Sequence, residues 1–380
     1  MELRTLSLMG FRNYIEDMIH FFPGANIIIG ENAQGKTSLL EAIYYLTGAK
    51  SFRTRFDREL IGHDLDAAQI KAEILSEART QTLEAQLQRG RKKNLFVNGV
   101  REKSAADFSG KLTAVLFSPD DLALVRDGAV VRRRFMDLSL SQIRPKYALW
   151  LSEFHRLYDH KNRILKDYRD KPSLLDTLDD FNFRLAKASA QLIYYRAAFL
   201  EKLAPSANMI HQAFSGNREE LTLTYETVST IENPCEKPAI LFHTLMAQQA
   251  RLRQAEIDAG QCLAGAHKDD IGISINGTSA RAYASQGQTR TVALSLKLAE
   301  REILFEDRGE YPLLLLDDVL SELDATRQDF VLNRISNGQV FITCCEDNGI
   351  AERTGGKIFM VEKGQVAVVG GERATHYRSQ

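Results

Sequence analysis

The sequence predicts an α/β fold in which a head of strands and turns is split by an inserted helical arm. Short apolar strands dominate residues 1–120, helical periodicity begins after Pro119 and lasts to about Gly260, and strands return from Ile271. We therefore place a first head lobe at residues 1–120, the arm at 121–262 and the second part of the head at 263–380. A chain of 380 residues is long enough to build two cores.

The composition limits the kind of partner and the compartment. Lysine and arginine together number 49 and aspartate and glutamate 50, so a nucleic acid would have to bind local basic patches. The four cysteines contain no C-x-x-C pair, which favours free thiols in a reducing cytosol. No apolar run approaches the roughly 18 residues of a membrane span, and the first residues run straight into a strand pattern. We expect a soluble cytoplasmic protein without a signal peptide or a membrane span.

The first lobe is predicted to consist mostly of strands. Candidate strands cover residues 4–8, 25–29, 69–75, 82–88, 94–97 and 112–117, and one helix covers about 36–46. The pair Asn98-Gly99 is typical of a two-residue hairpin turn. A basic cluster lies just before this hairpin and comprises Arg89, Arg91, Lys92 and Lys93.

Residues 27–40 join an apolar strand, a glycine-bounded loop and the start of a helix. The loop matches the pattern G-x-x-x-x-G-K-[ST], a P-loop, in which backbone N–H groups surround phosphate oxygens. Lys36 is placed to reach the outer phosphates and the Thr37 hydroxyl to bind Mg²⁺, while the helix start adds the positive end of its dipole. The predicted phosphate-binding residues are Gly30, Glu31, Asn32, Ala33, Gln34, Gly35, Lys36 and Thr37.

The arm is predicted to consist of antiparallel helices joined by short turns. One apolar series steps by three and four residues from Tyr147 to Tyr168, with Lys161 as its single polar member. A second series forms a heptad seam from Leu178 to Phe199. A third helix is expected at about 239–258 and one strand at 220–227. The core of an ordinary helical domain would produce the same pattern.

The second part of the head is predicted to begin with a strand at 271–275 and a helix from 289 to about 306. The leucines at 313–316 then predict a buried parallel strand that ends in Asp317 and Asp318. Because a P-loop ATPase needs an acidic partner, we expect Asp317 to hold Mg²⁺ through water and Asp318 to orient the attacking water. A solvated strand end is the alternative. A strand at 340–343 and a hairpin of 357–361 with 366–369 complete this part.

Two further segments flank these elements. Ser285-Gln286-Gly287-Gln288 precedes the helix at 289–306 and alone indicates only a flexible turn with a polar cap. Beside a P-loop and an Asp-Asp strand, Ser285, Gly287 and Gln288 also form a donor set for the γ-phosphate of a nucleotide held by another subunit. The segment 321–324 is predicted to start the next helix, and as a plain capping sequence it would have Ser321 as N-cap and Asp324 in the first turn.

These motifs, in this order, resemble the ABC-type ATPase heads of the SMC class. Along nearly the whole chain they resemble the RecF family of bacterial recombinational repair proteins. The stretches that carry the resemblance are 11–14, 30–37, 50–53, 117–122, 132–137, 265–270, 285–290 and 313–324. The resemblance implies an ABC-type, SMC-like P-loop ATPase head with an inserted helical arm, which binds ATP and Mg²⁺ and uses Arg12 and Asn13 as further nucleotide contacts.

The resemblance also implies what the protein works with. It implies an ATP-dependent homodimer with weak, DNA-stimulated ATPase activity. Such a dimer binds DNA at single-stranded gaps or single/double-strand junctions, and with RecO and RecR it helps load the RecA recombinase in repair, replication restart and the SOS response. Ala266 and Lys268 depart from the family pattern, which usually has Pro and Arg there, so we assign the neighbouring His267 no role.

The alternative function is an ABC-type ATPase subunit that acts on a protein or membrane partner without DNA. Transporter-type heads usually carry Gln where Ser118 stands, Leu-Ser-Gly-Gly-Gln at the signature and a His after the last strand, and all three are missing. The place of that His falls among Thr343, Cys344 and Cys345, and its absence predicts slow turnover. Arg53 is a candidate for phosphate or DNA sensing, or for a surface ion pair.

The candidate DNA contacts are basic clusters, although charge runs are usually solvated faces. Besides the cluster of Arg89, Arg91, Lys92 and Lys93, a second cluster consists of Arg132, Arg133 and Arg134. Basic residues of the arm form the remaining set: Arg144, Lys146, Arg156, Lys161, Arg163, Lys166 and Arg169.

Overall fold

A computed structural model describes residues 1–48, 50–77, 79–335 and 337–369, and the chain divides into two compact units. The first unit combines residues 1–121 with 297–380, and the second covers 122–296. The second unit thus extends beyond the predicted arm boundary at 262. The reason is a strand pairing, because β10 (Asp270–Ile275) runs antiparallel to β9 (Leu221–Glu226) in the arm.

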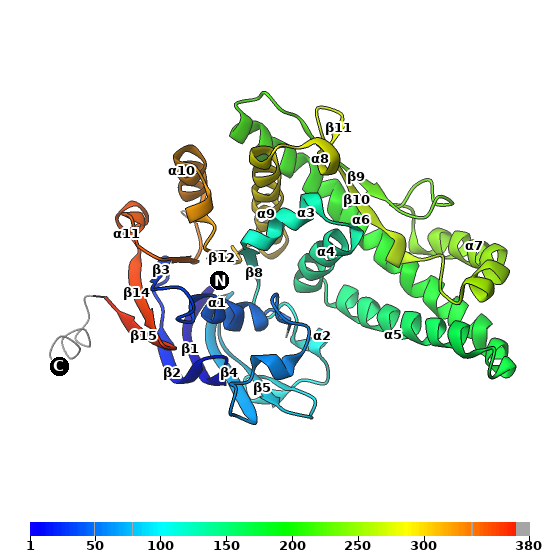
Figure 1. Cartoon of the computed structure of the whole chain (residues 1–380), viewed down its shortest axis with the longest axis horizontal. Helices are drawn as coiled ribbons and strands as arrows, with labels where there is room; N and C mark the ends of the chain where they lie inside the picture. Colours follow the sequence, from blue (N-terminus) through cyan, green and yellow to red (C-terminus); the bar gives the residue numbers. More distant parts are fainter. Residues whose placement is uncertain (49, 78, 336, 370–380) are drawn as a thin grey trace. The chain divides into compact units, whose positions relative to one another are not determined.

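The first unit contains two six-stranded sheets. Its elements in residues 1–121 are β1 (Glu2–Phe11), β2 (Tyr14–His20), β3 (Ala25–Ile29), α1 (Lys36–Tyr45), β4 (Ala67–Ser76), β5 (Arg79–Gln88), β6 (Asn94–Val97), β7 (Val100–Arg101), α2 (Ala105–Phe108) and β8 (Ala114–Phe117). Its later elements are β12 (Leu313–Asp317), α10 (Ala325–Arg334), β13 (Val340–Cys344), α11 (Ile350–Thr354), β14 (Lys357–Glu362) and β15 (Gln365–Val368). Figure 1 shows the chain in sequence colours.

One sheet brings the predicted strands of both head segments together. Its strand order is β15-β14-β3-β13-β12-β8, and all neighbours are parallel except the β14–β15 hairpin. In register, Ile29 lies opposite Cys344, and Thr343 lies opposite Asp317. The carboxyl ends of β3, β13 and β12 therefore meet at one edge, where ligands of open α/β sheets bind.

The other sheet is antiparallel, with the order β2-β1-β4-β5-β6-β7. Its apolar side chains alternate along the strands and share one core with α1 and the central strands of the parallel sheet. Leu6, Ile70, Leu40, Leu313 and Phe341 are all fully buried in this core. The core therefore fixes the helix that follows the P-loop between residues from both sheets.

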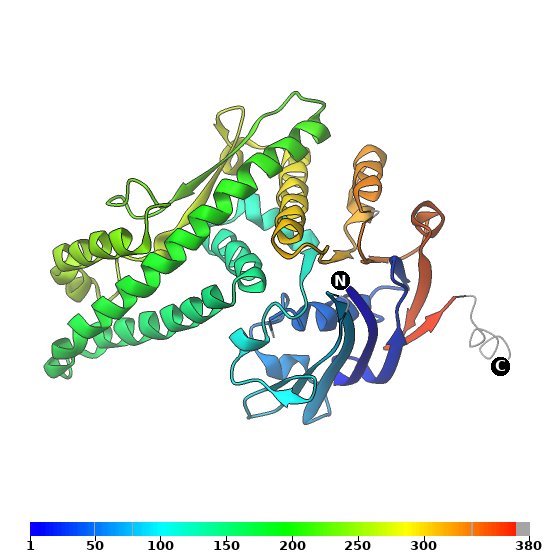
Figure 2. The same ribbon diagram turned by 180° about the vertical axis from the view of Figure 1, so that it is seen from behind.

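The second unit is mainly helical. Its elements are α3 (Ala123–Arg126), α4 (Ala129–Ile143), α5 (Pro145–Asp167), α6 (Leu178–Ser215), β9, α7 (Pro238–Ala259), β10, β11 (Thr278–Ser279) and α8 (Ala280–Tyr283). The helix α9 (Gln286–Arg308) begins in this unit, and its last residues belong to the first. Figure 2 shows α5 and α6 side by side and antiparallel, and α7 packs on α6, as the arm pattern predicts.

A buried ion pair explains the polar position in the α5 series. Lys161 Nζ lies 2.7 Å from Glu256 Oε2 on α7, and both side chains are 0% exposed. An unpaired charge at this depth would be costly, so the two residues join α5 to α7 as a pair. Lys161 is therefore wrongly predicted as a DNA contact.

Most predicted elements are confirmed within one to three residues, including the parallel strand at 313–317 and the C-terminal hairpin. The sequence did not predict β2, because Glu16 and Asp17 interrupt its alternation. The N-cap of α10 is Asp324, whose side chain accepts from Arg327 N, so the alternative with Ser321 as N-cap is wrong. None of the helices formed by the described residues has the length and apolar character that crossing a membrane requires.

Candidate nucleotide-binding site

The P-loop links β3 to α1, and its glycines allow close approach of neighbouring chain segments. Gly30 has φ +154°, and a Cβ there would lie 2.4 Å from the Val361 carbonyl oxygen. Gly35 has φ +121°, and its Cβ would meet the Asn13 amide at 2.7 Å. Any larger residue at either position would have to displace a neighbour, so this loop shape requires glycine.

Lys36 begins α1 and folds back across the loop. Its Nζ donates to the carbonyl oxygens of Gly30 at 2.5 Å and Glu31 at 2.9 Å, and the residue is only 8% exposed. The first N–H groups of a helix have no intrahelical acceptor. A fixed ammonium group beside such N–H groups suits an anion of several charges, as the sequence predicts.

Asp317 is the centre of a hydroxyl cluster at the end of β12. Its Oδ1 accepts from Thr37 Oγ1 and from Thr343 Oγ1, each at 2.9 Å. Burial raises the pKa of Asp317, and the two threonine hydrogen bonds oppose that rise. A threonine hydroxyl and a carboxylate are hard oxygen donors, which are the ligands that Mg²⁺ prefers.

Asp318 follows with a backbone that few non-glycine residues adopt. Its φ is +55°, its N–H donates to Thr343 Oγ1, and its Oδ1 accepts from Ser321 Oγ at 3.0 Å. Such a conformation costs on the order of 1 kcal/mol and is retained where the surroundings demand it. The turn separates the Asp318 side chain from the buried strand, and Asp318 lines the same cavity as Lys36.

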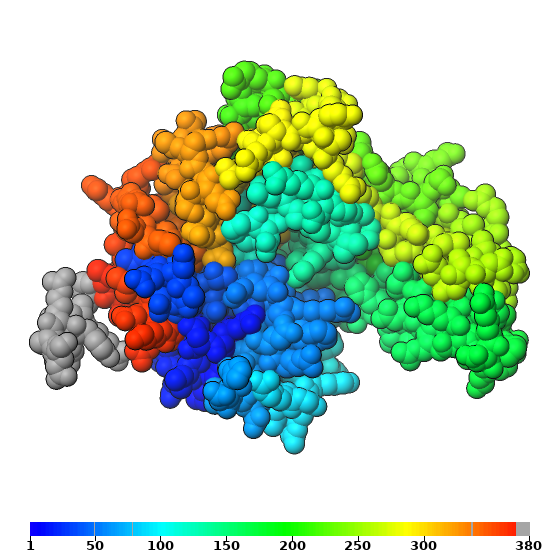
Figure 3. Space-filling view, in the orientation of Figure 1, coloured from blue at the N-terminus to red at the C-terminus, as the bar shows by residue number. Residues whose placement is uncertain are grey.

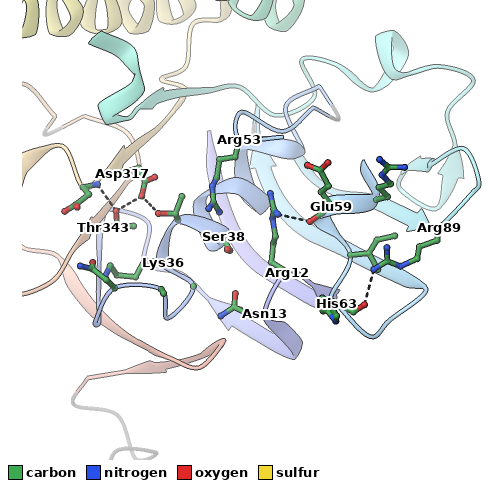
Figure 4. Close-up of a pocket in the computed structure, with 17 residues that line it drawn as sticks. Arg12, Asn13, Lys36, Ser38, Arg53, Glu59, His63, Arg89, Asp317 and Thr343 are labelled. Carbon is green, nitrogen blue, oxygen red and sulfur yellow. Dashed lines mark hydrogen bonds between the residues drawn. The ribbon is translucent and has the colours of Figure 1, made fainter. Parts of the chain in front are cut away.

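These residues share one cavity of about 720 Å³ within the first unit. Figure 4 shows Lys36, Asp317 and Thr343 grouped at one end and Glu59, His63 and Arg89 at the other. The lining residues are Arg12, Asn13, Asn32, Ala33, Gly35, Lys36, Thr37, Ser38, Arg53, Arg58, Glu59, Ile61, His63, Arg89, Asp317, Asp318 and Thr343. The cavity thus contains both acids and most of the P-loop.

Glu41 is buried behind the cavity wall and binds Arg12 and Arg53, which line the cavity, and the sequence analysis missed it. The Arg12 guanidinium makes two 2.8 Å hydrogen bonds to the fully buried Glu41 carboxylate, which also accepts from Ser51. Arg53 lies 3.5 Å from the same carboxylate, so its ion pair is with a buried acid and not the surface pair of the prediction. Arg53 also lines the cavity, and its role in phosphate or DNA sensing stays a prediction. The available signal was a lone acid among the apolar residues of α1.

Asn13 lies beside the P-loop. Asn13 Nδ2 donates to the Gln34 carbonyl oxygen at 2.8 Å. The three residues at the place of the missing His, Thr343, Cys344 and Cys345, have different surroundings. Thr343 bonds Asp317, Cys344 is buried, and the exposed Cys345 has its Sγ 3.5 Å from Asn32 Oδ1. The end of β13 therefore offers the Thr343 hydroxyl at the cavity, and the residue after the strand offers the Cys345 thiol at the P-loop.

The signature residues lie in the second unit and form a reciprocal cap on α9. Ser285 Oγ accepts from Gln288 N at 3.2 Å, and Gln288 Oε1 accepts from Ser285 N at 2.9 Å. Gln288 Nε2 also donates to Glu219 Oε1. This is a capping box, so the polar-cap interpretation of the segment is correct. The cap does not test the second prediction, in which Ser285, Gly287 and Gln288 donate to the γ-phosphate of a nucleotide held by another subunit.

Comparison with known proteins decides the family. The family model described as RecF/RecN/SMC N terminal domain matches residues 2–367. The DNA replication and repair protein RecF of Symbiobacterium thermophilum is 40% identical over 97% of this chain and 98% of its own length. The chain belongs to the RecF family. RecF of Bacillus subtilis strain 168 is 38% identical over 93% of this chain and 96% of its own.

Solved structures agree with this family and with the predicted fold class. The structure of the recombination mediator protein RecF-ATP in the RecFOR pathway has a TM-score of 0.90 at 32% identity and covers 97% of both chains. The Smc head domain from Pyrococcus furiosus, with an extended coiled coil, has a TM-score of 0.55 at 17% identity. The ABC-type, SMC-like head with an inserted arm is therefore confirmed.

In this RecF-family chain, several basic residues predicted to contact DNA are bound to protein groups instead. Arg132 is 4% exposed, and its guanidinium binds Asp270 and the carbonyl oxygens of Leu124 and Asp127. No face of the side chain remains for a phosphate, so the prediction for Arg132 is wrong. Arg133 donates to the Asp269 carbonyl oxygen, whereas Arg134 is exposed.

The basic cluster before the first hairpin also contains both residues bound to protein groups and residues that are exposed. Arg89 donates to the carbonyl oxygens of Leu65, Gly62 and His63, and Lys93 pairs with Asp57 at 3.0 Å. These two residues hold the loop that borders the cavity. Arg91 and Lys92 are exposed and line a second hollow on the antiparallel sheet. They stay candidates for DNA.

Arg196, which the sequence analysis did not single out, links two of the stretches that carry the family resemblance, 132–137 and 265–270. Arg196 is 2% exposed and pairs with Asp137 at 2.8 Å and Asp269 at 2.7 Å. Tyr225 and Thr227 also donate to the Asp269 carboxylate. Burial raises the pKa of Asp269, while Arg196 and these hydroxyl groups oppose the rise. The network joins α4, α6 and β9 to the residue that precedes β10, so its role is structural.

His267 belongs to the packing of the same unit. Its Nε2 lies 3.2 Å from the Cys262 carbonyl oxygen, and its ring is 4.7 Å from the Tyr158 ring. Burial lowers its pKa to about 4, which keeps the imidazole neutral. These contacts agree with assigning His267 no chemical role.

Proposed function

We propose that the protein is an ATP-dependent DNA-binding protein of recombinational repair and replication restart. The observation that carries this proposal is the single cavity in which the P-loop lysine, the Thr37–Asp317 pair and Asp318 lie together in a member of the RecF family. The solved RecF-ATP structure, at 32% identity over nearly the whole chain, supports ATP as the nucleotide.

Each residue has a proposed role in nucleotide binding. The loop from Gly30 to Gly35 surrounds the phosphates, Lys36 neutralises them, and Thr37 and Asp317 hold Mg²⁺. Bound by these two residues, Mg²⁺ would supply positive charge that offsets the charge of the phosphates. Asp318 orients the attacking water or accepts a proton from it. Arg12 and Asn13 act from the wall of the cavity, where Arg12 is fixed by Glu41 and Asn13 by Gln34.

The proposed cycle couples the nucleotide to a homodimer. ATP binding favours the dimer, the dimer binds single-stranded gaps or single/double-strand junctions, and slow hydrolysis releases it. Of the two clusters, Arg91, Lys92 and Arg134 are exposed and are proposed first as DNA contacts, while Arg89, Lys93 and Arg133 stay candidates that also bind protein groups. RecO and RecR are the proposed partners in loading the recombinase, because the related structure belongs to the RecFOR pathway.

Retention on DNA tests the proposal. The purified protein is expected to stay on immobilised double-stranded or gapped DNA with ATP and Mg²⁺, and to elute with ADP or without a nucleotide. The retained fraction should fall steeply with salt, because binding to phosphates releases counterions. A protein that dimerises with ATP but elutes equally under all three conditions would favour the alternative, an ATPase subunit acting on a protein or membrane partner.

A mixing experiment tests whether Ser285 acts on the nucleotide of the partner subunit. Ser285→Arg is expected to bind ATP but fail to dimerise, since a bulky cation replaces a small hydroxyl, while Lys36→Ala fails for lack of nucleotide. By two-fold symmetry a heterodimer of the two has one site with both lesions and one with neither. ATPase activity should therefore return on mixing, measured as phosphate release.

A covalently linked heterodimer removes weak association as an explanation for failure. If the linked protein recovers no activity, either Ser285 does not act across the dimer or both sites must hydrolyse together. Each single variant, linked to a copy of itself, provides the background rate.

A further inference from the structure

The strand beside the P-loop strand continues into a turn of unassigned function. β14 runs parallel to β3, with Met360 opposite Ile29. The next residues of β14 therefore run alongside the P-loop, and a two-residue turn, Lys363-Gly364, leads back into β15. Both turn residues have positive φ, +48° and +73°, as a tight hairpin turn requires.

This turn contacts the P-loop at Gln34 through two backbone donors. Lys363 N donates to Gln34 Oε1 at 2.7 Å, and Gly364 N donates to the Gln34 carbonyl oxygen at 3.0 Å. The same carbonyl oxygen accepts from Asn13 Nδ2 at 2.8 Å. Gln34 is thus held from two sides, by the β14–β15 turn and by the β1–β2 turn.

The neighbouring P-loop carbonyl oxygens are also occupied. Tyr14 Oη donates to the Gly35 carbonyl oxygen at 3.0 Å, and Lys36 Nζ holds those of Gly30 and Glu31. The hairpin is itself anchored, because Val366 N donates to Asp17 Oδ2 on β2 at 2.8 Å. Figure 3 shows the hairpin surface against the N-terminal strands. The loop is therefore held by residues outside it as well as by its own Lys36.

We propose that the turn Lys363-Gly364 is a clamp that presets the P-loop for phosphate binding, with Gln34 and Gly364 as positioning residues. The inference rests on the proposed function and adds a part of the chain to its nucleotide site. A loop that is held in its binding shape before the ligand arrives loses less conformational freedom on binding. Without the clamp, the loop becomes ordered only when the nucleotide binds, and this loss of conformational freedom lowers the affinity for the nucleotide.

Gly364→Ala tests the clamp. A Cβ at this position would lie 2.1 Å from the Asn13 carbonyl oxygen, so the β14–β15 turn and the β1–β2 turn, which both hold Gln34, must move apart. We expect affinity for both ATP and ADP to fall about tenfold or more, since both use the same loop. Equilibrium binding with labelled nucleotide measures this. In nucleotide-free protein, hydrogen exchange should become faster in peptides that cover residues 30–40.

Gly309→Ala is the matched control. Gly309 has the same φ of +73°, lies in the same unit and has nothing within 4 Å of a built Cβ. Both variants therefore carry the same backbone strain. Only the substitution at position 364 places a Cβ against Asn13, which holds the P-loop. If Gly364→Ala matches Gly309→Ala in nucleotide affinity and in exchange at residues 30–40, the clamp proposal is wrong.

Gln34→Ala provides a second variant if Gly364→Ala does not fold. It removes only the side-chain acceptor of Lys363 N, and we expect about three- to tenfold weaker binding with faster local exchange before any nucleotide is added. Unchanged exchange in that state would overturn the clamp. A wild-type protein that binds no ATP would instead refute the proposed function, while the nucleotide-free exchange comparison would still decide the clamp.

Discussion

Replacing Lys36 with alanine is expected to abolish ATP binding, and with it ATP-dependent dimerisation and DNA retention. Lys36 is 8% exposed as a residue, and its ammonium group donates to the carbonyl oxygens of Gly30 and Glu31 in the P-loop. Hydrogen bonds to charged groups contribute about 1.5–3 kcal/mol each, so losing two such bonds from Lys36 to the phosphates corresponds to roughly 10²- to 10⁴-fold in affinity. Titration with labelled ATP measures the loss.

The control for Lys36→Ala is Lys111→Ala, which removes an exposed lysine of the same unit that does not line the cavity. It should bind ATP as the wild type does, with the same thermal unfolding midpoint. Wild-type affinity in Lys36→Ala would remove the P-loop from the proposed mechanism.

Asp318→Asn is expected to keep ATP binding, to slow hydrolysis by about 10²- to 10⁴-fold and to prolong the DNA-bound dimer. Asparagine is nearly isosteric, tolerates the φ of +55° and still accepts from Ser321, so the substitution removes mainly the negative charge. Single-turnover phosphate release and the dissociation rate from DNA are the measurements.

Asp329→Asn serves as the comparison, since Asp329 is a carboxylate of α10 that does not line the cavity and pairs with Arg353. Its turnover should equal that of the wild type. Normal hydrolysis in Asp318→Asn would assign the handling of water to another residue.

The sequence predicted the strands and helices that carry strong local patterns. The four leucines before Asp317 are buried on both faces of a parallel strand, and an apolar run of this length has few other solutions. The P-loop is similarly local, because its glycines, lysine and threonine are adjacent in the chain. The proximity of Thr37 and Asp317 followed from the expected chemistry and is confirmed by their hydrogen bond.

The errors concern side chains whose partners are remote in sequence. Arg132 lies in a charge run that predicts a solvated face, but its carboxylate partner, Asp270, is 138 positions away. Glu41 was visible in the sequence only as a lone acid, because Arg12, Ser51 and Arg53 converge on it only in the folded unit. The clamp was equally hidden, since backbone N–H groups leave no mark in a sequence.

The strand pairing of β3 has a consequence for the order in which the protein can mature. Both neighbours of β3 come from the end of the chain, β13 at residues 340–344 and β14 at 357–362. During synthesis the P-loop strand therefore emerges early and waits for more than 300 residues before either neighbour exists. All strand pairs of the second unit lie between residues 221 and 279, so that unit's own sheet is complete sooner. A chain that ends before residue 340 therefore contains the P-loop but neither of the two strands that pair with β3.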